Sequence, residues 1–142
     1  MSHYASIVTK RVGARSTPRE LDPKAEGFVY GGPAASCWDA LNQICFQLGV
    51  PALKNFQWQV EGSQKDIETE YEGIWYNPEK GLQTVSAVLH FLQHSSHIQL
   101  KAHFTDRFIE EHLEWIVFDL RAYEMILITA REQKDPFRLS IC

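Results

Sequence analysis

The longest helical pattern of the chain, from Thr105 to about Arg131, is apolar on more than one side. Its main stripe recurs at three- and four-residue steps and consists of Ile109, Leu113, Ile116, Val117, Leu120, Tyr123 and Leu127. Its second half adds Trp115, Phe118, Ala122, Met125 and Ile126. One face of a sheet cannot cover such a helix. We therefore expect either a central helix covered by other elements or a helix that lies in a subunit interface.

The second apolar side of this helix favours self-association. Phe118 and Met125 are seven residues apart and lie together, about 150° around the axis from the main stripe. The other predicted helices are short and already direct their apolar stripes at the sheet. A two-fold contact between copies of one patch closes without open ends. The sequence thus predicts a homodimer whose interface contains Trp115, Phe118 and Met125.

Two forms of this helix are compatible with its sequence. It either runs unbroken to about Arg131 or breaks near Phe118, with Asp119 capping a second helix. In the unbroken form Asp119 lies beside Trp115 and Tyr123 and is a partly buried carboxylate. In the broken form it is only a cap.

The remaining patterns predict an α+β fold. Strand-like segments are expected at residues 4–12, 27–32, 56–62, 66–76 and 137–142, the third and fourth forming a hairpin. Two helices are expected, one between a capping box of Ser36 with Asp39 and the stop at Gly49, the other starting at Asn77 and Pro78. Residues 97–104 read as a short strand or a connection. Together they predict one domain, 1–142, with an antiparallel sheet of four to five strands and two to four helices packed mainly on one face.

Composition excludes several classes of protein. The chain has 142 residues, of which 44% are hydrophobic and 23% charged, as in a soluble globular domain. Fourteen basic and eighteen acidic residues give a net charge of −4, which argues against nucleic-acid binding. No apolar run approaches the roughly 18 residues of a membrane span, and residues 1–10 do not resemble a secretory signal. These features, with three cysteines in all, predict a cytoplasmic protein without membrane contact.

One segment is strongly acidic. Between Glu61 and Glu79 there are six acidic residues and one basic residue, a local charge of −5. Four of these acidic residues alternate along the second predicted strand of the hairpin: Asp66, Glu68, Glu70 and Glu72. Together with Glu61 they form one acidic face of the hairpin. Such a face is either simply solvated or attracts a basic partner. Trp75 and Tyr76 point opposite ways on a strand, so one of them is expected to be exposed and to anchor that partner.

Histidines and a cysteine are the candidates for other chemistry. His90 and His94 lie four residues apart on a helix, and His97 follows closely, so all three are weak metal candidates. The apolar stripe of that helix centres opposite His90 and His94, which therefore point to solvent, and we expect no metal and no cofactor. Cys37 lies near a helix N-terminus, which lowers a thiol pKa, but also on an apolar face, which raises it.

No common catalytic signature occurs in the chain, such as a nucleophile elbow, a phosphate-binding loop or a paired-cysteine motif. The leading hypothesis is therefore a non-enzymatic binding protein that offers its acidic hairpin face to a basic protein partner. The alternative is a small enzyme or ligand-binding domain, with a pocket between sheet and helices that uses histidine, Asp119 or Cys37.

Overall fold

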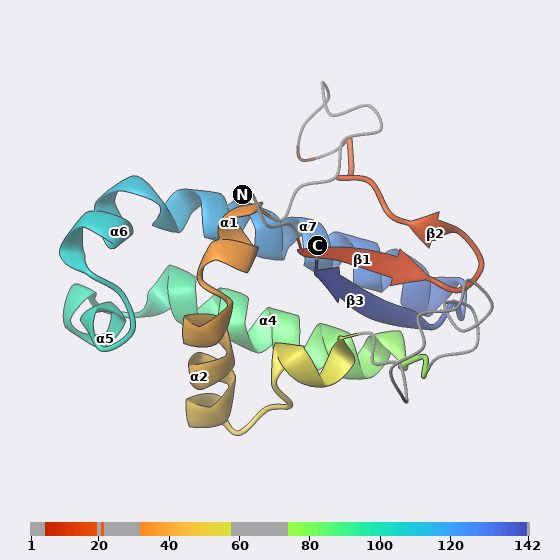
Figure 1. The fold of residues 1–142 in the computed structure, drawn as a ribbon, viewed down its shortest axis with the longest axis horizontal. Coiled ribbons are helices and arrows are strands. Elements are labelled where there is room, and N and C mark those ends of the chain that lie inside the picture. The colour runs from red at the N-terminus through yellow and green to blue at the C-terminus, as the bar shows by residue number, and fades with distance from the viewer. Residues whose placement is uncertain (1–4, 20, 22–31, 58–73, 142) are drawn as a thin grey trace.

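Two long antiparallel helices, α4 (Pro78–His94) and α7 (Leu113–Glu132), pack against each other along the molecule (Figure 1). The structure is a computed structural model that describes residues 5–19, 21, 32–57 and 74–141. Helix α7 contacts α4 on one side, and it also contacts the short helix α1 (Gly32–Ser36) and strand β1 (Ala5–Thr9). The two-sided apolar character of this helix is thus matched, at least in part, by two sets of neighbours within the chain.

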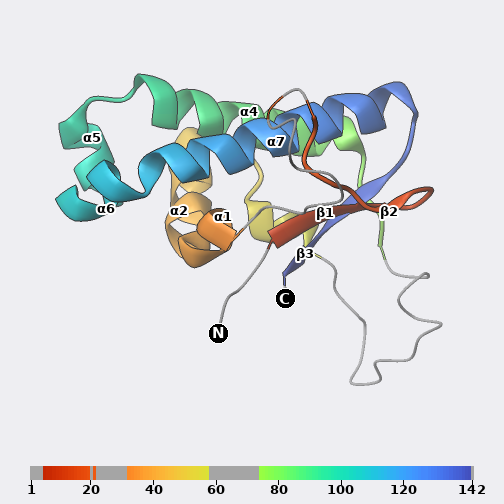
Figure 2. The ribbon, with the colours of Figure 1, turned by 90° about the horizontal axis from the view of Figure 1, so that it is seen from above.

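The sheet joins segments from the two ends of the described chain. Strand β1 lies between β2 (Gly13–Ala14) and β3 (Phe137–Ile141), and both pairings are antiparallel. In Figure 2 the three strands lie beside α7. Alternate residues of β1 are buried: Ala5, Ile7 and Thr9. The strands predicted at the start and the end of the chain are therefore present, and the fold class is α+β as predicted.

The predicted number of strands is wrong, because the sheet of the described residues has three strands and not four to five. Phe56, expected to begin a strand, instead ends a 3-10 helix, η1 (Leu53–Phe56). Next to it, Gln57 makes only an isolated parallel bridge to Leu139, and Tyr76 an isolated antiparallel bridge to Phe137. Most of the predicted hairpin and residues 27–31 of the other predicted strand lie outside the described residues.

The number of helices is also corrected, since the described residues contain six α-helices and not two to four. Besides α1, α4 and α7 these are α2 (Trp38–Leu48), α5 (His97–Lys101) and α6 (Asp106–Glu111). Helix α5 occupies the segment expected as a strand or a connection. Its start is a capping box, in which the Ser96 hydroxyl accepts from the backbone N–H of Gln99, and the side-chain Oε1 of Gln99 accepts from the backbone N–H of Ser96 at 2.8 Å.

Three of the predicted helix ends can be compared with the structure. The Asn77 side chain accepts from the N–H of Glu79 at 2.9 Å, and Gly49 ends α2 with φ 73°, both as predicted. The capping box predicted at Ser36 is wrong. Its hydroxyl instead donates to the carbonyl oxygen of Pro33, and α2 starts after Cys37 without a side-chain cap.

The helical segment after Thr105 breaks at a place that neither predicted form contains. Helix α6 ends before His112, whose φ of −124° and ψ of −19° separate it from α7. Asp119 therefore lies inside α7, where it is buried, and does not cap a helix. In the part of the chain that the structure describes, no helix has the length and apolarity needed to span a bilayer.

Candidate functional site

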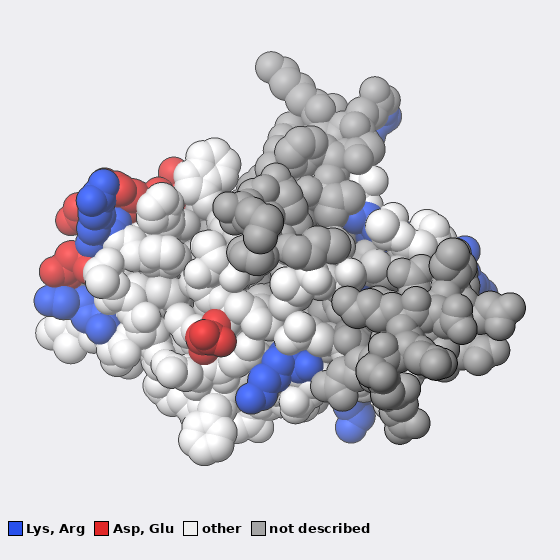
Figure 3. Space-filling view, in the orientation of Figure 1, with Lys and Arg blue, Asp and Glu red and all other residues white. Residues whose placement is uncertain are grey.

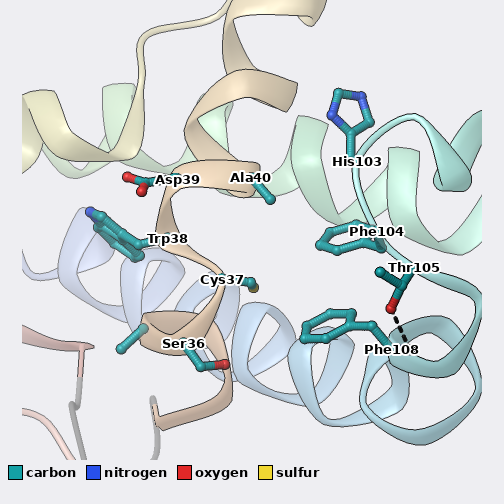
Figure 4. A pocket seen from close by; sticks show the side chains of 10 residues that line it. Ser36, Cys37, Trp38, Asp39, Ala40, His103, Phe104, Thr105 and Phe108 are labelled. Atoms are coloured by element: carbon teal, nitrogen blue, oxygen red, sulfur yellow. Dashed lines mark hydrogen bonds between the residues drawn. The ribbon is translucent and has the colours of Figure 1, made fainter.

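A groove of about 380 Å³ lies between the N-terminal turn of α2 and the corner where α5 leads into α6. Figure 4 shows its two walls. Cys37 and Ala40 point into it from one side, and the rings of Phe104 and Phe108 project toward them from the other. The groove is thus an open depression between helices that are distant in the sequence.

The aromatic wall is a continuous series of ring contacts. Phe104 and Phe108 are stacked with an interplanar angle of 6° and ring centroids 5.0 Å apart. His103 extends this series, with ring centroids 5.8 Å from Phe91 and 6.4 Å from Phe104. The hydroxyl of Thr105 accepts from the N–H of Phe108 at 3.1 Å and so starts α6 at a fixed place. Capping and stacking together hold the wall in one geometry.

Cys37 contributes a neutral thiol to the opposite wall. Its thiol donates to the carbonyl oxygens of Pro33 and Ala34, both at 3.6 Å. Burial, and secondly the negative charge of Asp119, raise the pKa of Cys37 to about 12. The thiol is therefore protonated at neutral pH and is a poor nucleophile. Its sulfur instead supplies apolar, polarisable surface to the groove.

Asp119 lies behind this wall and not among the groove-lining residues. One carboxylate oxygen, Oδ2, accepts from the N–H of Ala34 at 3.0 Å, whereas Oδ1 has no hydrogen-bond partner within the described residues. Burial raises the pKa of Asp119 to about 6, although the Ala34 N–H lowers it in part. Tyr123, one turn further along α7, donates its hydroxyl to the carbonyl oxygen of Ala5. Asp119 therefore fastens α1, and with it the segment that leads to Cys37, onto α7.

His103 is the histidine that lines the groove. Its Nε2 lies 2.8 Å from Oε1 of Gln47 on α2, so the two walls are joined by a hydrogen bond. Burial lowers the pKa of His103, which favours the neutral ring.

The three metal candidates do not come together. His90 and His94 are exposed on α4, with ring centroids 4.4 Å apart. Helix α4 ends at His94, and His97 starts α5 with its Nε2 only 2.6 Å from Oδ1 of Asp106. Among the residues that the structure describes, no group of three histidine, cysteine or acidic side chains could hold a metal ion.

The acidic segment is not available for comparison, since Glu61, Asp66, Glu68, Glu70 and Glu72 lie outside the described residues. Trp75 and Tyr76 are described, and both are half-buried. Their role as an anchor for a partner stays a prediction. The guanidinium of Arg138 lies 4.0 Å from the centroid of the Trp75 ring. The Tyr76 ring packs edge-on against Phe56.

The residues predicted to form an oligomer interface lie on α7. Trp115 is half-exposed, at 51%, whereas Phe118 and Met125 are half-buried in the single chain. Met125 also lines a second groove, of about 450 Å³, together with Arg15 and Pro18. The homodimer stays a prediction.

The sequence analysis did not select Phe104 and Phe108, which form the aromatic wall. Their spacing of four residues, with Thr105 as a helix cap between them, is the signal that the sequence offered. No known family, curated protein or solved structure matches the chain. The chemistry of the groove must therefore be read from its own side chains.

Proposed function

We propose that the chain is a non-enzymatic binding protein whose groove receives an apolar, ring-shaped group of its ligand. The stacked pair of Phe104 and Phe108, facing the neutral thiol of Cys37, is the observation that carries this proposal. Aromatic rings gain about 0.5–1.5 kcal/mol from a well-placed ring contact beyond the burial of their surface. Ligand pockets also start at about 300 Å³, and the groove has a volume of about 380 Å³.

The protonation of the groove favours binding over catalysis. Nucleophilic catalysis by a cysteine needs a thiolate and an adjacent base. Burial instead raises the pKa of Cys37 to about 12, and its thiol is hydrogen-bonded to two carbonyl oxygens. His103, the histidine of the lining, is hydrogen-bonded through its Nε2 to Oε1 of Gln47. An enzyme that used Cys37 in this state would lack an activated nucleophile.

Indole is a suitable probe, because it is a flat uncharged ring. In amide NMR spectra of the ¹⁵N-labelled protein, indole is expected to shift the signals of Cys37, Ala40 and Phe104 in a saturable manner. Phe108→Ala removes half of the stacked wall and is expected to weaken this binding at least several-fold. Phe46→Ala is the matched control, since Phe46 is 88% exposed on α2 and does not line the groove. Scattered shifts, or equal effects of the two variants, would contradict the proposal.

The acidic segment supports a second candidate function, the attraction of a basic protein partner. The six acidic residues between Glu61 and Glu79, opposed by one basic residue, favour it. Changing Asp66, Glu68 and Glu70 to lysine is expected to abolish binding of the protein to a polylysine surface. Unchanged retention would exclude this function.

The cytoplasmic location and the homodimer also stay proposals, and sedimentation of a 16.4 kDa species at micromolar concentration would refute the dimer.

A further inference from the structure

The end of the molecule that contains the groove carries an excess of acidic side chains. Helices α5 and α6 and the first turns of α2 and α7 have two basic residues, Lys101 and Arg107. The acidic residues of the same elements number five: Asp39, Asp106, Glu110, Glu111 and Glu114. Five acidic and two basic residues leave a net charge of −3. In Figure 3 acidic and basic atoms gather over α5 and α6, and the surface between them and α2 is largely uncharged.

Both basic residues of this end are already held by carboxylates. Lys101 Nζ lies 3.4 Å from Oδ2 of Asp106, and Arg107 forms an ion pair of 3.2 Å with Glu111, one helical turn away. The remaining acidic residues have no ion pair within the described part of the chain: Asp39, Glu110 and Glu114. Among the described residues of these elements, the charge that is left without an ion pair is therefore negative. A field of one sign attracts ligands of the opposite sign and rejects those of its own.

We propose that the groove docks a basic peptide segment of a protein partner, with an aromatic side chain of that segment seated between Phe108 and Cys37. This inference rests on the proposed function, because the aromatic anchor uses the same groove. Basic side chains on either side of the anchor then reach Asp39 on the α2 wall and the carboxylates of α6 and α7.

The placement of the acidic residues favours an extended partner over a small molecule. Asp39 lines the groove, but Glu110 and Glu114 do not. A peptide longer than the groove brings further basic residues into the negative field of α6 and the start of α7, where Glu110 and Glu114 lie, whereas a small molecule in the groove does not. The groove then binds the aromatic side chain of the peptide, and the surrounding carboxylates attract its basic side chains. Many interfaces likewise combine a buried aromatic side chain with a polar rim.

Three pentapeptides with a central phenylalanine test the charge of the partner. The flanking residues are lysine in the first, serine in the second and glutamate in the third. Peptide titrations followed by NMR are expected to give affinities in the order lysine, serine, glutamate at low salt. The differences should nearly vanish at about 0.5 M salt, where exposed charges are screened within a few ångströms. Equal affinities at low salt would overturn the inference.

Charge-neutralising variants locate the effect on the protein. Asp39→Asn and Glu114→Gln are each expected to weaken binding of the lysine peptide about two- to fivefold, as the loss of one exposed ion pair does. Neither should change binding of the serine peptide. Glu132→Gln, at the opposite end of α7, removes the same charge and serves as the control. Equal weakening by Glu132→Gln would show that only net charge matters, and would refute docking at the groove.

The indole titration separates this inference from the proposed function. Indole binding in the groove, with no discrimination among the three peptides, removes the basic partner and leaves the binding function intact. Absence of indole binding removes the proposed function, and a preference for the lysine peptide without shifts at Phe104 and Cys37 then places the peptide elsewhere. Indole binding, together with saturable shifts at these two residues that the lysine peptide produces at the lowest concentration of the three peptides, would support the inference.

Discussion

The buried carboxylate of Asp119 makes the stability of the protein depend on pH in a defined direction. Burial raises its pKa from the ordinary value of 3.8 to about 6. The folded protein therefore binds this proton more tightly than the unfolded chain does. Its ionisation lowers the free energy of unfolding above pH 6, and this cost disappears as the pH falls toward 4. A difference of about 2 pKa units corresponds to about 3 kcal/mol.

The substitution Asp119→Asn isolates this effect. An asparagine oxygen can still accept from the N–H of Ala34, so α1 keeps its attachment to α7. The variant carries no charge at this position, and the difference in unfolding free energy between variant and wild type is expected to rise by about 2.4 kcal/mol from pH 4 to pH 7. Urea denaturation followed by circular dichroism at several pH values in this range measures that difference. Any constant cost of burying the amide cancels, because it does not depend on pH.

Parallel stability curves for the two proteins would refute the reasoning. Asp106→Asn is the control with the opposite sign. Its exposed carboxylate accepts a hydrogen bond from His97, and this bond and Lys101 lower the pKa of Asp106. The stabilisation from Asp106 is therefore present above pH 4 and is lost as the pH falls below it, so this variant should approach wild-type stability in acid.

Two further substitutions test the packing at the other end of the molecule. At Gly81 an added Cβ would lie 2.2 Å from Cζ of the buried Phe137, so Gly81→Ala is expected to lower the unfolding free energy by about 1–3 kcal/mol. Urea denaturation of Gly81→Ala alone and combined with Phe137→Leu checks this, and a single variant as stable as wild type would contradict the contact. Asp135 is fully buried, accepts from the N–H of Arg11 at 2.8 Å and pairs with Arg15 at 3.0 Å. Asp135→Asn should lower the unfolding free energy by about 3 kcal/mol. Glu111→Gln, which removes one partner of an exposed ion pair, should change it little. Equal effects of the two substitutions would contradict the idea that burial makes the Asp135 pair more important for stability.

Local signals of the sequence predicted several helix ends correctly. Asn77 with Pro78 and Gly49 are examples, because a cap or a left-handed residue acts within one turn of the chain. The capping box of Ser96 with Gln99 is an equally local signal, and it marks the start of α5. Such features need no knowledge of the tertiary structure.

Features that depend on distant segments could not be predicted in this way. Asp119 accepts from Ala34, which lies on another helix far away in the sequence, and periodicity shows only which side of a helix is apolar. The groove likewise lies between α2 and the segment from α5 to α6, where Gln47 and His103 are in contact although they are 56 residues apart in the sequence. Phe56 shows the same limit for strands, since the alternation that begins at this residue predicted a strand, whereas Phe56 ends a 3-10 helix.

The pairing of β1 with β3 constrains the order in which the chain can fold. Ala5 is opposite Ile141, and Thr9 is opposite Phe137, so nearly the whole described chain separates the partners. During synthesis, β1 leaves the ribosome long before β3 has been made. Ile7 therefore has no β3 strand to pair with while the helices form. Closing such a long loop is slow, and an unpaired apolar strand is prone to aggregate in the meantime. Nascent chains that stall before Phe137 should therefore be the species that chaperones retain.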